Sequence, residues 1–186
     1  MPAHHSLTIR VPLPSILPAE AVIATLQSQS PVIRHQPLIT RFEKVPVALD
    51  KIVNDEFFLE SGFKIASYKI YEKVTVVPGV KTEISFPATL QNIPNGLRSR
   101  ADAPGGVRVW SEWLVLPRPA ERWPGEHSSG KLGGYVEGDY DLVETTHVET
   151  SRMLMPLVKG QMESAHRGMV QKMLDEVAQK VGRAKM

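Results

Sequence analysis

The sequence predicts an α+β fold in which a curved antiparallel sheet wraps around a long C-terminal helix. Segments that alternate apolar and polar residues, as strands do, follow one another through the middle of the chain. Residues 151–186 instead repeat apolar side chains at steps of three and four, the spacing of one helix face. Strands grouped together, with helices before and after them, indicate a sheet that buries one face against helices.

The N-terminal third predicts short elements. Residues 6–13 alternate loosely and read as a first strand, which Pro12 and Pro14 are expected to end. Pro18 suits the first turn of a helix over residues 19–28. Three prolines in 30–50 leave room only for a short helix and a short strand at about 38–45, and residues 50–62 fit either a helical turn or a covering loop.

A meander of about five strands follows. Its predicted strands are residues 65–76, 81–91, 97–101, 107–116 and 135–148. Pro and Gly mark the turns between the first four, because Pro fixes φ and Gly allows positive φ. Residues 117–134 are predicted to form a long loop rich in Pro, Gly and Ser, and loops of that length are often lids or disordered inserts.

The predicted C-terminal helix carries a methionine-rich stripe. Its members are Met155, Val158, Met162, Ala165, Met169, Met173 and Val177. Methionine is unbranched and polarizable, so such a stripe fits an irregular apolar surface. Two interpretations stay open: the stripe fills a core against the sheet, or helix and sheet close over a ligand cavity.

Length and composition narrow the class of protein. A chain of 186 residues predicts one domain over residues 1–186. The net charge of +2 and the scattered basic residues give no support for a nucleic-acid partner. The absence of cysteine excludes disulfides and thiolate metal sites. With no secretory pattern and no apolar stretch near the ~20 residues that span a bilayer, we predict a soluble, cytoplasmic protein without stable membrane insertion.

Several segments of the chain match a known layout: 67–72, 77–79, 92–97, 103–106, 142–144 and 155–159, which leads on to Ala165 and His166. With the order of the predicted elements, these segments resemble the helix-grip fold of the START and polyketide-cyclase-like (SRPBCC) superfamily. More narrowly, the chain is similar to a family of uncharacterised fungal START-like proteins. The resemblance implies a START-like domain with an apolar ligand cavity between sheet and helix, and a fungal source. Members include carriers and cyclases, so the fold alone implies no activity.

Three inward residues are the candidates for catalysis. Alternation places Glu72 and Tyr68 on the buried face of one strand, and Glu144 on the buried face of the last strand. A buried carboxylate must be paired, hydrogen-bonded or protonated, because burying a lone charge is costly. Glu72 and Glu144 could supply acid catalysis or orient a ligand, and Tyr68 could donate to a ligand carbonyl. The alternative is that each carboxylate pairs with a basic residue or lies at a wet sheet edge.

Further inward residues are candidates for ligand binding: Phe86, Asn92, Trp113, Met162, His166 and Met169. The Trp113 indole could stack on a planar ligand and donate one hydrogen bond, or simply pack in the core. His166 could lie at the cavity mouth as an acid, base or donor, or on the flank of the helix.

The chain has no phosphate-binding loop, no dinucleotide fingerprint and no nucleophile elbow, and its histidines lack ligand spacing. We therefore expect no metal and no cofactor. The leading hypothesis is a cofactor-free cyclase or isomerase acting on an apolar natural-product intermediate, with a Diels–Alder-type pericyclic reaction as one form. The alternatives are a carrier of a lipid, sterol or other apolar molecule, and an interaction protein with a filled core. Either a monomer or a homodimer fits.

Overall fold

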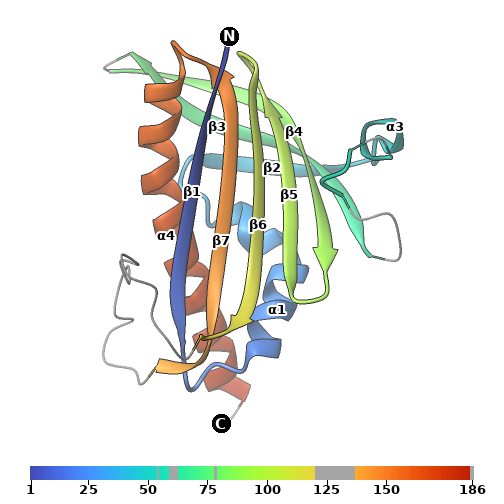
Figure 1. The fold of residues 1–186 in the computed structure, drawn as a ribbon, viewed down its shortest axis with the longest axis vertical. Coiled ribbons are helices and arrows are strands. Elements are labelled where there is room, and N and C mark those ends of the chain that lie inside the picture. Colours follow the sequence, from blue (N-terminus) through green and yellow to red (C-terminus); the bar gives the residue numbers. More distant parts are fainter. Residues whose placement is uncertain (54, 59–62, 78, 120–136, 185–186) are drawn as a thin grey trace.

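The computed structural model describes residues 1–53, 55–58, 63–77, 79–119 and 137–184 (Figure 1). Seven strands form one antiparallel sheet in the order β1-β7-β6-β5-β4-β3-β2. A helix of thirty residues, α4 (Met155–Ala184), lies along the sheet on its inner side. The predicted α+β fold, a curved antiparallel sheet around a long C-terminal helix, is confirmed.

The meander is also confirmed. Its strands are β3 (Ile65–Val77), β4 (Val80–Ile93), β5 (Gly96–Ala103), β6 (Val107–Pro117) and β7 (Glu137–Ser151). Each pairs antiparallel with the next. Gly79, between β3 and β4, has φ of 83°, and Gly105 and Gly106, between β5 and β6, have φ of 78° and 73°. These are the left-handed conformations that glycine adopts without steric cost.

Strand β1 (Pro2–Pro14) is longer than the sequence predicts. Pro12 stays within the ladder opposite Asp141, and the register shifts only between Pro12 and Pro14. Proline is tolerated there because β1 is an edge strand that pairs with β7 alone, so an N–H on its free side is not needed. The strand ends at Pro14, within one residue of the predicted end, and its extra length is at the N-terminus, where Pro2 pairs with Ser151 of β7.

The remaining N-terminal elements match the prediction closely. They are α1 (Ala19–Gln27), α2 (Ser30–Arg34), the edge strand β2 (Ile39–Val45) and the one-turn helix α3 (Leu49–Ile52). Of the undetermined stretch 50–62, α3 is helical, Phe58 is buried, and residues 54 and 59–62 lie outside the described residues. Most of the predicted lid, 117–134, also lies outside them.

Helix α4 begins four residues later than predicted, because β7 runs on to Ser151. A turn closed by Leu154 N–H donating to the Ser151 carbonyl at 3.1 Å separates strand from helix. This turn sends the chain from the end of β7 back along the inner face of the sheet (Figure 1). The methionine stripe then points at the sheet, with Met162, Met169 and Met173 all buried.

The space between α4 and the sheet has two parts. At the C-terminal half of α4, which we call the packed end, α1 also contacts the helix and the side chains Val22, Leu26, Met173 and Leu174 are completely buried. At the N-terminal half, which we call the hollow end, helix and sheet enclose a cavity. The candidate site lies in that cavity.

Candidate functional site

The cavity at the hollow end has a volume of about 530 Å³. Its walls come from α2, from β2 to β6, and from the first three turns of α4. Most of the lining is aliphatic or aromatic, as in pockets that hold small organic ligands. The polar side chains of the lining are Gln36, Glu72, Ser99, Ser111, Gln161 and His166.

His166 and Glu144 form a buried pair at one wall. Helix α4 presents His166 to the cavity, one turn after Met162, while β7 holds Glu144 behind it with 0% of its surface exposed. The Nδ1 of His166 is hydrogen-bonded to Oε1 of Glu144. Thr146, two residues along on the same face of β7, donates to the same oxygen at 3.5 Å. A neutral imidazole held through Nδ1–H keeps its lone pair on Nε2, and no described residue hydrogen-bonds to Nε2.

Glu72 on β3 lines the same cavity and makes no hydrogen bond to a described residue. Burial raises the pKa of Glu72, and the positive charge that His166 can carry opposes the rise. Glu72 and His166 are therefore electrostatically coupled across one apolar space. An acid whose pKa is raised and a base oriented by a carboxylate are the two groups that general acid–base chemistry needs.

Trp113, Phe86 and Met162 are the predicted apolar lining residues that reach the cavity. Trp113 is held on β6 by a close approach of backbones: a Cβ on Gly96 would lie 1.8 Å from the carbonyl oxygen of Trp113. Only glycine fits at that point, at the start of β5. The indole N–H of Trp113 is buried and meets no acceptor among the described residues, so its expected hydrogen bond is not made within the described chain.

Tyr68 and Asn92 both hydrogen-bond to Gln29 instead of facing the cavity. The Tyr68 hydroxyl donates to Gln29 Oε1 at 3.0 Å, and Gln29 Nε2 donates to Asn92 Oδ1 at 2.9 Å. Neither Tyr68 nor Asn92 lines the cavity. Gln29 is fully buried with φ of 69°, at the centre of a tight turn closed by Ser30 N–H donating to the Ser28 carbonyl at 2.9 Å. The network thus holds the α1–α2 turn against the sheet.

Met169 is completely buried and does not line the cavity, because it lies on the first turn of α4 that belongs to the packed end. Of the predicted site residues, the fold therefore brings Glu72, Phe86, Trp113, Met162 and His166 together, with Glu144 directly behind His166. The sequence reading did not include Ser99, Ser111 and Gln161, which also line the cavity. Periodicity could have predicted that these side chains point inward from β5, β6 and α4, but an inward Ser or Gln does not by itself indicate a binding site.

No group of three His, Asp or Glu side chains in the described ranges is placed to hold a metal ion. Within those ranges, no helix has the length and apolar character needed to cross a bilayer.

Solved structures with this architecture define the class. The di-domain ARO/CYC protein BexL has a TM-score of 0.58 and 8% identity, over 94% of this chain and 50% of that one. The Zhui aromatase/cyclase from Streptomyces sp. R1128 has a TM-score of 0.51 and 14% identity, over 97% and 96% of the two chains. Ara h 8.0201 has a TM-score of 0.53 and 9% identity, over 95% and 99%. At such identities the likeness shows the fold alone.

The protein therefore has the helix-grip fold of these structures, with a cavity between the sheet and the long helix. Within that class, the chain belongs to the family described as domain of unknown function (DUF7053), which matches residues 2–179. No curated protein matches it significantly.

Proposed function

We propose that the protein is a cofactor-free cyclase or isomerase that moves protons on an apolar natural-product intermediate by general acid–base catalysis. The observation that carries the proposal is the pair His166–Glu144 facing Glu72 across a mostly apolar cavity. In this role His166 is the base, Glu72 is the acid, and Glu144 positions the imidazole.

The chemistry follows from the geometry of these groups. His166 Nε2 takes a proton from a carbon next to a carbonyl of the substrate, while Nδ1–H stays hydrogen-bonded to Glu144. Glu72 in its acid form gives its proton to the carbonyl oxygen, which yields an enol. The enol carbon either attacks a second carbonyl, closing a ring as His166 gives its proton to the new alkoxide, or takes that proton from His166 at another carbon, which is an isomerisation. In both cases Glu72 takes back the enol O–H proton as the first carbonyl re-forms, so His166 and Glu72 regain their starting protonation states before the product leaves.

Proton transfer explains more of the site than the other readings. A pericyclic reaction needs only a cavity that folds the substrate and a hydrogen-bond donor, so it does not explain why Glu144 is fully buried behind His166. A carrier of an apolar molecule has no use for a buried carboxylate–imidazole pair either. Burying a carboxylate costs several kcal/mol before its partners compensate. This cost favours a role in which the pair acts on the ligand.

The test uses 2-tetralone, an apolar bicyclic ketone with exchangeable protons beside its carbonyl. NMR in D₂O follows the exchange of those protons with the wild-type protein and with His166→Gln. We expect the wild type to accelerate exchange and the variant to fall to the buffer rate, because the base is removed. The matched control is His147→Gln, since His147 lies on the outer, exposed face of β7 and is bonded to Ser6.

Calorimetry on the same samples separates catalysis from carriage. If 2-tetralone binds the wild-type cavity but exchanges at the buffer rate, the acid–base proposal is wrong and a carrier role is supported. Equal rates for His166→Gln and the wild type would likewise remove His166 from the mechanism.

A further inference from the structure

A row of three hydroxyl groups runs across the inner face of the sheet, and two of them, Ser99 and Ser111, line the cavity without taking part in the mechanism above. Ser99 on β5 is opposite Ser111 on β6, and Ser111 is opposite Thr146 on β7. Residues directly opposite in an antiparallel sheet share a face, so all three side chains lie on the inner side. Ser111 and Thr146 are hydrogen-bonded through their hydroxyls at 2.9 Å and are almost completely buried.

The row has a direction, set by Glu144. A carboxylate oxygen that receives His166 Nδ1–H only accepts, so Thr146 must donate its proton to Oε1 of Glu144. Because that proton is used, Thr146 can only accept from Ser111, and Ser111 donates. The Ser111 oxygen then offers lone pairs alone to any further partner. Ser111 therefore acts as an acceptor where it lines the cavity.

Ser99 completes the row at its open end. Its side chain lines the cavity and makes no hydrogen bond to a described residue. Its neighbours on the same face are Leu90 on β4 and Ala101 on β5, which offer no polar group, and Ser111 on β6, whose oxygen can only accept. Ser99 is half-buried, so its hydroxyl is open to a ligand in the cavity. Ser99 can either donate or accept, since neither of its functions is used within the described chain.

We propose that Ser99 and Ser111 form a subsite for a hydroxyl group of the substrate. The substrate's O–H donates to the Ser111 oxygen and its oxygen accepts from Ser99, so one hydroxyl satisfies both serines. A carbonyl or ether oxygen only accepts and pairs with Ser99 alone. Resting on the proposed function, this assigns the substrate to hydroxylated apolar ring compounds, held by their hydroxyl in a fixed orientation toward His166 and Glu72.

The experiment measures the affinity of three probes of nearly equal shape: 2-naphthol, 2-methoxynaphthalene and 2-methylnaphthalene. Titration calorimetry gives each dissociation constant for the wild type, Ser99→Ala and Ser111→Ala. We expect the wild type to bind 2-naphthol about tenfold more tightly than 2-methylnaphthalene, with the ether in between. Each alanine variant should reduce that preference to about threefold or less, while affinity for 2-methylnaphthalene stays unchanged.

The matched control is Ser67→Ala. Ser67 and Thr89 make the same kind of cross-strand hydroxyl pair, also at 2.9 Å, and neither lines the cavity. That variant should keep the full preference for 2-naphthol. Equal affinity of the wild type for all three probes, an unchanged preference in both cavity variants, or no binding of any probe would overturn the subsite.

These outcomes are independent of turnover. Loss of the hydroxyl preference leaves the 2-tetralone exchange result standing, and failure of the exchange leaves a measured preference standing.

Discussion

The two halves of helix α4 carry the same methionine stripe, but one half packs in the core and the other lines the cavity. At the packed end, Met169, Met173 and Val177 are completely or almost completely buried, and α1 fills the space between helix and sheet. At the hollow end, Val158 and Met162 face a cavity of about 530 Å³. The difference is in what lies opposite the stripe, since the stripe itself continues. A soft apolar face accepts a protein core in one place and can accept a ligand in the other.

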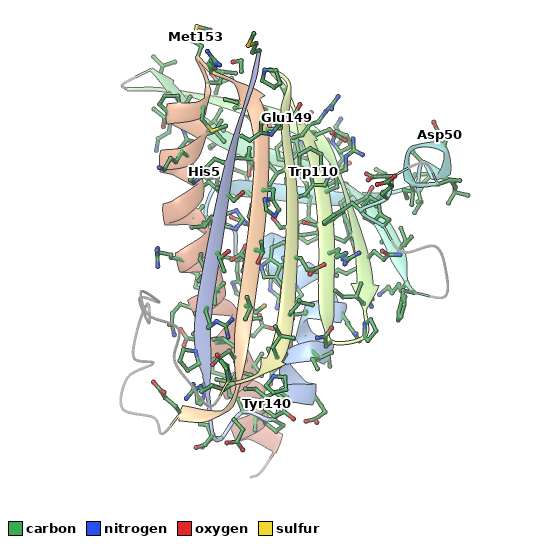
Figure 2. All side chains as sticks on the ribbon, in the orientation of Figure 1. His5, Asp50, Trp110, Tyr140, Glu149 and Met153 are labelled. Carbon is green, nitrogen blue, oxygen red and sulfur yellow. The ribbon has the colours of Figure 1, made fainter. Side chains whose placement is uncertain are left out.

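The two ends also differ in their charged groups. At the packed end, Glu176 of α4 lies on the surface and bonds to Arg34, His35 and Lys180, which ties α2 to the helix. At the hollow end, Glu72 has no hydrogen-bond partner among the described residues and faces the cavity. Glu176 therefore stabilises the fold, whereas Glu72 lowers its stability when it is charged. Figure 2 shows the described side chains of the protein on the ribbon.

The largest expected effect compares two methionines of the stripe. Met173→Ala should lower the free energy of unfolding by about 3 kcal/mol, because the void it leaves is enclosed by well-packed side chains. Met162→Ala should cost only about 1 kcal/mol, since Met162 already borders empty space. Guanidinium unfolding of both variants measures the difference. Equal losses would mean that the cavity end is as tightly packed as the other.

The next effect concerns Glu144. Glu144→Gln keeps the shape but replaces the charged acceptor that orients His166 with a neutral amide, which no longer stabilises the imidazolium, so 2-tetralone exchange should slow by about a hundredfold. Glu144 lies behind His166 and does not line the cavity, so the dissociation constant of 2-tetralone should stay the same. A lower rate with unchanged binding identifies a positioning residue. A parallel loss of binding would instead indicate that the cavity has collapsed.

The smallest effect is the pH dependence of the stability that Glu176 and Glu72 contribute, which has opposite signs for the two residues. Interactions with Lys180, Arg34 and His35 lower the pKa of Glu176 from 4.5 to about 2, against the effect of burial. Its contribution is therefore present above pH 4.5 and is lost as the pH falls toward 2. Glu176→Gln should cost about 1 kcal/mol at neutral pH, because solvent weakens a partly exposed cluster, and much less near pH 2.

Glu72→Gln should act in the other direction. Burial raises the pKa of Glu72, so the folded state binds its proton more tightly than the unfolded chain. That contribution is complete below the ordinary value of 4.5 and is lost as the pH rises through the higher folded value. The variant should therefore be more stable than the wild type at neutral pH and similar to it in acid. Urea unfolding across pH 3–7 would contradict this if Glu72→Gln were the less stable protein at neutral pH.

Much of the fold was predictable because it depends on local pattern. Period-two alternation located β3 to β7, and steps of three and four located α4. Two predicted boundaries were wrong because they depend on a neighbouring strand: β1 begins at Pro2 and α4 begins at Met155, and both follow from the extension of β7 to Ser151. The inward faces of Glu72, Trp113 and His166 were likewise readable from periodicity, as their positions in the cavity lining show.

The strand and helix pattern, the inward carboxylates and the methionine stripe could be predicted from the sequence, because side-chain periodicity follows from backbone geometry alone. The tertiary structure sets which inward residues meet. It joined Glu144 of β7 to His166 of α4, 22 residues away, and committed Tyr68 to Gln29, 39 residues away. It also decided which half of the stripe is filled and which is hollow. These outcomes depend on strand register and on the placement of α1 and α2, which distant segments set together and no local pattern records.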